Sequence, residues 1–155
     1  MRAHAAVLAL ALLATQLTNA VAQGRPVQVQ GRTDLDFGVI VAGVPTAVAP
    51  FPGGGMFRVR GTRGAEVQIQ FTLPPSLDGP GGSAPLAFTA TDGAHSPDPA
   101  PAAAQIFDPR LPLTFIMPTG QVYYVWIGGT LSPPATLSAG TYSATIVLTA
   151  TYTGN

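Results

Sequence analysis

Apolar and polar residues alternate along most of this 155-residue chain, and that alternation restricts what it can fold into. The clearest run is 66–73, where Val67, Ile69, Phe71 and Leu73 alternate with polar residues. A period of two places every second side chain on the same face of a β-strand. Beyond the first 22 residues no segment of ten or more residues shows helical spacing, so we expect almost no helix.

Glycine and proline interrupt the alternating runs. The chain has 18 Gly and 16 Pro, and clusters of them end one run and precede the next, which predicts turns. The runs that we expect to form strands are 35–41, 57–60, 66–73, 86–90, a short run at 106, 113–117, 122–131 and 141–153. Because 122–131 is apolar on both faces, it is expected to be a central strand. We predict an all-β antiparallel sandwich of about eight or nine strands.

The first 22 residues have the pattern of a secretory signal peptide. Arg2 precedes an apolar run at 5–14, and Ala20-Val21-Ala22 is a cleavage site of the A-x-A type. Ten apolar residues are too few for a helix that spans a bilayer. We therefore expect export to the periplasm, the cell surface or the medium, with no membrane span after cleavage and a single domain at 23–155.

The segment 93–104 contains Pro97, Pro99 and Pro101 among small residues. Such a segment has little to bury, so we expect a mobile Pro/Ala-rich loop. His95, the only histidine beyond residue 22, lies in this segment and is expected to be exposed to solvent.

The composition excludes most chemistry. The chain contains no Cys and no Lys, Glu66 is its only glutamate, and the charged residues are 9% of the total and cancel. A lone His without an ordered partner does not make a triad, and one Glu does not make a glycosidase pair. Asp34 and Asp36 supply fewer oxygens than Ca²⁺ needs. We predict no enzyme activity, no cofactor, no metal site and no nucleic-acid binding.

Three aromatic residues allow a second interpretation. Tyr124 and Trp126 share one face of their strand, and Tyr123 shares the other with Val125 and Ile127. One face must belong to the core, and a single Trp is expected there. The alternative is that Tyr123, Tyr124 or Trp126 stacks on a sugar ring.

Several short motifs together resemble the bacterial secreted family known as domain of unknown function 4402. The resemblance covers nearly all of 23–155 and rests on the order of the motifs. They are LDFGVI at 35–40, FRVRG at 57–61, VQIQFTLP at 67–74, IGGTL at 127–131 and AGTY at 139–142. The resemblance implies an exported immunoglobulin-like or pilin-like sandwich and assigns no activity.

The last strand is similar to that of chaperone-usher fimbrial subunits and of spore-coat-like secreted proteins. In those proteins an alternating strand begins at a Gly and ends on a Tyr near the C-terminus. The matching residues here are Gly140, Tyr142, Ile146, Leu148 and Tyr152. Two features depart from the pattern. Three residues follow Tyr152, and 23–33 offers few large apolar residues for a donated strand.

These observations favour assembly over turnover. We expect an exported structural or adhesive, fimbria-like subunit whose sheet edges bind other subunits and a periplasmic chaperone. The face that carries Tyr142, Ile146, Leu148 and Tyr152 is expected to be buried. The alternative is a secreted carbohydrate-binding module that uses the aromatic residues at 123–126.

Overall fold

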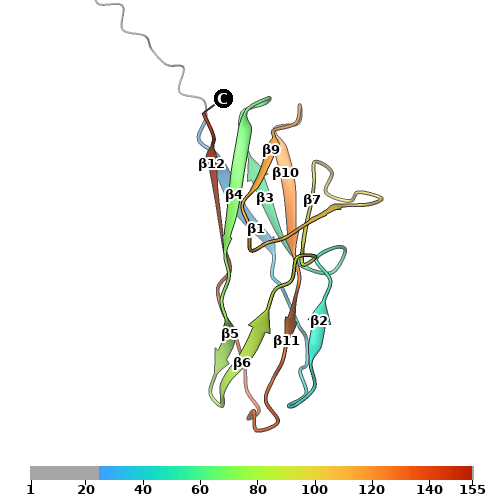
Figure 1. Cartoon of the computed structure of the whole chain (residues 1–155), viewed down its shortest axis with the longest axis vertical. Coiled ribbons are helices and arrows are strands. Elements are labelled where there is room, and N and C mark those ends of the chain that lie inside the picture. The colour runs from blue at the N-terminus through green and yellow to red at the C-terminus, as the bar shows by residue number, and fades with distance from the viewer. Residues whose placement is uncertain (1–24, 155) are drawn as a thin grey trace, which may run out of the picture.

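The computed structural model describes residues 25–154, and the predicted signal peptide at 1–22 lies outside them. Within 25–154 the protein is all-β, with twelve antiparallel strands, no helix and three sheets (Figure 1). No helix long and apolar enough to cross a membrane is therefore present in this range. The predicted β-sandwich class is confirmed.

The upper half of the molecule in Figure 1 is formed by two sheets that face each other. The larger sheet has five strands in the order β1 (Gln28–Thr33), β3 (Gly55–Arg60), β10 (Val122–Ile127), β7 (Gly93–Ser96) and β8 (Gln105–Phe107). The smaller sheet has three strands in the order β12 (Val147–Tyr152), β4 (Glu66–Thr72) and β9 (Leu113–Ile116). As expected, the run at 122–127 is a central strand, because β10 lies between β3 and β7.

The main core fills the space between these two sheets. Along β4, Val67, Ile69 and Phe71 are buried while the residues between them are exposed or half-buried. Phe115 of β9 stacks on Tyr123 of β10 with ring centroids 4.0 Å apart, which joins the two sheets. The alternation read from the sequence therefore places this strand in the correct register.

The lower half of the molecule is a four-stranded sheet with its own smaller core. Its strands are β2 (Thr46–Val48), β11 (Gly129–Leu131), β6 (Gly82–Ala87) and β5 (Ser76–Gly79), in that order. Ala84, Leu86 and Leu131 are buried here. Leu77, Phe37 and Ile40 pack against them.

Glycine and proline account for the larger number of strands. Gly128 separates β10 from β11, and a Cβ atom there would lie 2.2 Å from the carbonyl oxygen of Val48. Pro74 and Pro75 likewise separate β4 from β5. The expected strand at 122–131 is thereby divided in two, and β5 forms where no strand is expected, so the described chain has more strands, and shorter ones, than predicted.

The strand expected at 35–41 does not form. The carboxylate of Asp36 accepts a hydrogen bond from the backbone N–H of Gly38 (2.7 Å), and Gly38 has a φ of 64°. This local turn competes with an extended strand. Instead β1 forms just upstream and pairs with β3, with a bulge between Gly31 and Thr33. No strand was expected at β1.

The prediction of an exposed His95 is wrong. Residues 93–96 form β7, paired with both β10 and β8, and all four are buried. The Nδ1 atom of His95 lies 3.0 Å from the hydroxyl of Tyr123, in a hydrogen bond. His95 also contacts the edge of Phe107. The small side chains of 93–96 permit this close packing, so only 97–104 remains outside the strands.

Candidate functional site

A groove runs along one side of the sandwich, where the first and last segments of the domain meet. At the upper end this side is closed, because β1 lies against β12. Below that point the groove opens between residues 31–37 and 144–146, with a volume of about 270 Å³. Leu35, Phe57, Leu77 and Ile146 are among its lining residues.

The groove continues downward as two further hollows. One is lined by residues 34–38 on one wall and by 140–144 on the other. The next is lined by residues 38–40 and 137–140. We call this continuous feature, with walls at 31–42 and 137–146, the seam groove.

Much of the backbone in the walls of the seam groove makes no backbone–backbone hydrogen bond. Within the described residues, 34–42 belongs to no strand, and its only backbone–backbone bond is from the N–H of Val44 to the carbonyl of Val41. On the opposite wall, Ser143 exchanges two 3.0 Å bonds with Asp78. Backbone N–H and C=O groups that have no backbone partner form an edge at which another strand can add.

Three of the residues predicted for the last strand face the main core. Leu148 is buried and lies opposite Phe71 in the β12–β4 ladder. Ile146 and Tyr152 are half-buried and pack against the same core. This side of β12 therefore faces the core, as expected.

Tyr152 also joins both ends of the domain. Its hydroxyl donates to the carbonyl oxygen of Arg25 (2.7 Å) and accepts from the backbone N–H of Thr62 (2.7 Å). One side chain thus connects the N-terminal segment, the β3–β4 turn and the last strand.

The other two predicted residues lie at the lower end, away from the main core. Tyr142 packs on the β5–β6 turn, where a Cβ atom on Gly81 would lie 2.5 Å from its hydroxyl. That hydroxyl donates to the carbonyl of Ser138 (2.7 Å). A Cβ atom at Gly140 would lie 2.4 Å from Pro80. Tyr142 belongs to neither core cluster, so its expected place in the core is wrong; it fixes the lower wall of the seam groove.

Comparison with known proteins adds no assignment. The chain matches no family model, no curated protein and no solved structure. The likeness to domain of unknown function 4402 and to fimbrial subunits therefore stays a prediction, and the seam groove has to be judged from its own geometry.

The three aromatic residues of the alternative interpretation have different surroundings. Tyr123 is buried in the main core, and burial raises the pKa of its hydroxyl. Trp126 is on the opposite, outer face of the sheet but is only 3% exposed, because Phe51 packs edge-to-face on it. The Trp is thus buried as expected, although outside the main core. Tyr124 is half-buried on that outer face.

His95 and Tyr123 form a neutral buried pair. Burial lowers the pKa of His95 and raises that of Tyr123, so both shifts favour the uncharged forms. The ring of His95 lies between Tyr123 and Phe107, inside the sandwich. The pair therefore contributes to packing rather than to a site that substrate could reach.

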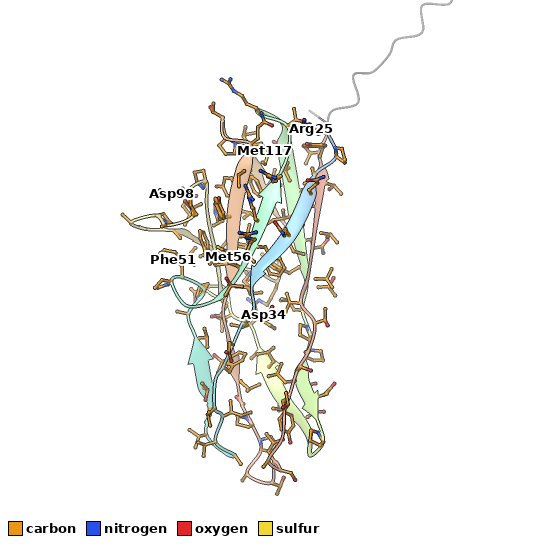
Figure 2. All side chains as sticks on the ribbon, turned by 180° about the vertical axis from the view of Figure 1, so that it is seen from behind. Arg25, Asp34, Phe51, Met56, Asp98 and Met117 are labelled. Atoms are coloured by element: carbon orange, nitrogen blue, oxygen red, sulfur yellow. The ribbon has the colours of Figure 1, made fainter. Side chains whose placement is uncertain are left out.

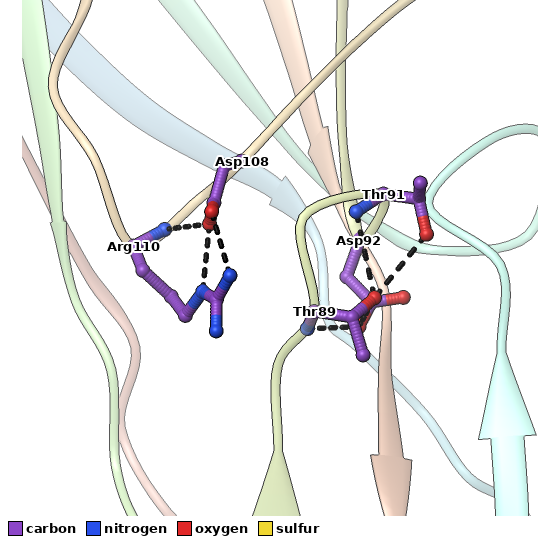
Figure 3. Close-up of polar contacts among 5 residues, drawn as sticks. All are labelled: Thr89, Thr91, Asp92, Asp108 and Arg110. Atoms are coloured by element: carbon purple, nitrogen blue, oxygen red, sulfur yellow. Dashed lines mark hydrogen bonds and ion pairs between the residues drawn. The ribbon is translucent and has the colours of Figure 1, made fainter.

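The carboxylates lie mostly in turns, where they bind backbone or neighbouring side chains. Asp92 accepts from the N–H and the hydroxyl of Thr89, and Asp108 binds Arg110 (Figure 3). The hydrogen bond from the Arg110 side chain lowers the pKa of Asp108 to about 2. The hydroxyl of Ser83, and to a smaller extent that of Ser76, donates a hydrogen bond to the carboxylate of Asp78 and lowers its pKa. Between residues 25 and 154, no three His, Asp or Glu side chains are grouped so that they could hold a metal ion.

Sequence reasoning missed the exposed aliphatic residues beside the seam groove. Val39 is 96% exposed, and Val41 and Val44 are each more than half exposed. In the run at 35–41, Val39 and Val41 alternate in step with Leu35 and Phe37, so alternation alone predicts that they lie on the buried face of a strand. The signal for a different structure was the pair Gly38 and Gly43, both of which adopt positive φ.

Proposed function

We propose that the protein is an exported structural or adhesive subunit, of fimbria-like type and with an immunoglobulin-like or pilin-like sandwich. It assembles with other subunits by adding a strand at the seam groove. The observation that carries this proposal is the segment 34–42, which pairs with no strand and lies beside a groove lined in part by apolar side chains. The resemblance to domain of unknown function 4402 and the predicted signal peptide support it.

The chemistry of the edge suits a polypeptide strand. Backbone N–H and C=O groups supply affinity for another backbone, while pockets that receive alternate side chains supply specificity. The seam groove offers such pockets between Leu35, Phe37, Leu77 and Ile146. The exposed valines at 39, 41 and 44 extend this apolar surface beyond the groove.

The N-terminal segment is not the natural donor in this assembly. Residues 28–33 form β1 and already pair with β3 in the same chain. A partner therefore supplies its own strand or edge to 34–42, and a periplasmic chaperone would protect the same edge before assembly.

We expect the double variant Val39→Lys/Val41→Lys to self-associate more weakly than the unmodified protein. Both side chains are exposed, so the monomer should keep its fold. Lysine on an edge opposes strand pairing through its charge. Analytical ultracentrifugation over a concentration series should show association weakened by at least about tenfold, which corresponds to 1.4 kcal/mol.

The matched control is Leu111→Lys/Ile116→Lys. These residues are aliphatic, are each more than half exposed, and lie in or beside β9, the edge strand of the smaller sheet opposite β12. The control variant should associate as the unmodified protein does. Equal weakening by both double variants, or a strictly monomeric unmodified protein, would contradict the proposed function.

A further inference from the structure

The outer face of the five-stranded sheet carries three of the six arginines that lie in residues 25–154. This face, seen from outside in Figure 2, is called here the arginine face. The register places Gln30, Arg58 and Tyr124 side by side across β1, β3 and β10, and places Gln28 beside Arg60 in the next row. Its six polar members are Gln28, Gln30, Arg32, Arg58, Arg60 and Tyr124.

No acidic side chain of the sheet lies on this face. Its remaining outward residues are apolar or small, namely Thr33, Met56, Val122, Trp126, Ala94, Ser96 and Ile106. The only ion pair within residues 25–154 joins Arg110 to Asp108, at a different place. Arg32, Arg58 and Arg60 are therefore three cations without a carboxylate partner in the described chain.

Arg58 lies at the centre of the arginine face and is held by packing. Its side chain is half-buried, and its Nε atom is buried without a hydrogen-bond partner. Gln30, which lies next to Arg58 on β1, accepts a 3.4 Å hydrogen bond from the side chain of Arg32. A partly buried arginine side chain loses less freedom than an exposed one when an anion binds to its outer nitrogens.

Tyr124 provides a fixed aromatic surface beside Arg58. Its ring stacks on Trp126 with centroids 6.2 Å apart. Trp126 is in turn covered by Phe51 from the loop that precedes β3. Gly54 makes that cover possible, because a Cβ atom there would lie 2.3 Å from the carbonyl oxygen of Ile127. The ring of Tyr124 therefore packs on a Trp126 ring that Phe51 holds in place.

A polar hollow extends the arginine face at its upper end. Arg25, Gln28, Arg60 and Gln121 are among the residues that line it, and its volume is about 540 Å³. Figure 2 shows Arg25 at this end of β1. The hollow therefore adds a fourth cation and further amide groups in line with Arg60.

We propose that the arginine face binds an acidic polysaccharide, in which sugar carboxylates pair with Arg58 and Arg60 and a sugar ring packs on Tyr124. Arginine binds carboxylates through two parallel hydrogen bonds, and the glutamine amides suit sugar hydroxyls. The inference is independent of the proposed function, because it concerns a different face and a single subunit.

An acidic polysaccharide fits this face better than a nucleic acid does. Nucleic-acid affinity comes from neutralising many closely spaced phosphates, usually by a strongly basic domain. This chain carries equal numbers of acidic and basic residues. The four arginines, three glutamines and one tyrosine of the face and its hollow match a ligand that offers carboxylates and many hydroxyls.

The test is calorimetric titration of the monomeric protein with an oligogalacturonide, with a dextran oligomer and a single-stranded DNA oligomer as comparison ligands. We expect saturable binding of the oligogalacturonide that weakens with added salt. Arg58→Gln, Arg60→Gln and Tyr124→Leu should each weaken it by about tenfold or more.

Arg63→Gln is the matched control, because it removes the same charge from an exposed turn residue outside this face. It should leave binding unchanged. Arg60 is exposed, so its variant keeps the test valid even where Arg58→Gln lowers stability. No binding of the oligogalacturonide, equal binding of dextran, tighter binding of the DNA, or an equal effect of Arg63→Gln would overturn the proposal.

Discussion

Removing residues 141–155 is expected to abolish folding of the isolated chain. The deletion removes β12, which is the partner of β4 along one edge, and leaves only β4 and β9 in the smaller sheet. A two-stranded sheet is marginal in water. Val67, Ile69 and Phe71 would also lose cover. Circular dichroism and limited proteolysis should show an unfolded or aggregated protein.

A synthetic peptide of residues 141–153 should restore the fold when it is added to the truncated chain, because it can pair with β4. Deletion of only residues 154–155 is the control and should leave the fold intact, since Tyr152 and its hydrogen bonds remain. A truncated chain that stays folded and monomeric without the peptide would show that β12 is not required.

Leu148→Ala is expected to lower the free energy of unfolding by about 2 to 5 kcal/mol. Leu148 is buried between the two sheets and lies opposite Phe71. The smaller side chain leaves a cavity that the surrounding strands fill only in part. Chemical denaturation, followed by the fluorescence of the single Trp, measures the change.

Thr151→Ala is the matched control for this substitution. Thr151 is on the same strand but on the exposed face, opposite Gln68. Its substitution should change the free energy of unfolding by less than about 0.5 kcal/mol. Equal changes at both positions would mean that the register of β12 is shifted by one residue.

The sequence predicts those strands whose two faces have different environments or are both buried. In β4 the alternation of Val67, Ile69 and Phe71 with polar residues matches one buried and one exposed face. In β10 both faces are apolar because one faces the core and the other is covered at Trp126 by Phe51. Burial alone determines both patterns, so local sequence is enough to recognise them.

Other parts of the fold depend on contacts that local sequence does not reveal. His95 is buried because Tyr123 and Phe107, distant in sequence, surround it. The segment 35–41 has a strand-like pattern, but the turn at Asp36 and Gly38 interrupts it, and within residues 25–154 it belongs to no strand. Conversely, β1 contains few apolar residues and forms because β3 offers it a free edge.

The candidate site was predicted in part for the same reasons. The alternation at 146–152 identified the buried face of the last strand. The position of Tyr142 on the β5–β6 turn depends on glycines more than 60 residues away along the chain. The arginine face could not be predicted, because it requires the registers of β1, β3 and β10 together.

Amide hydrogen exchange tests the central claim most directly. We would compare the protein at a concentration where it assembles with the dilute monomer, using mass spectrometry to locate protection. If a strand is added at the seam groove, the amides of residues 34–42 exchange more slowly in the assembled state, while those of β9 are unchanged. Protection of β9 with no change at 34–42, or the absence of any assembled state, would contradict assembly at this edge.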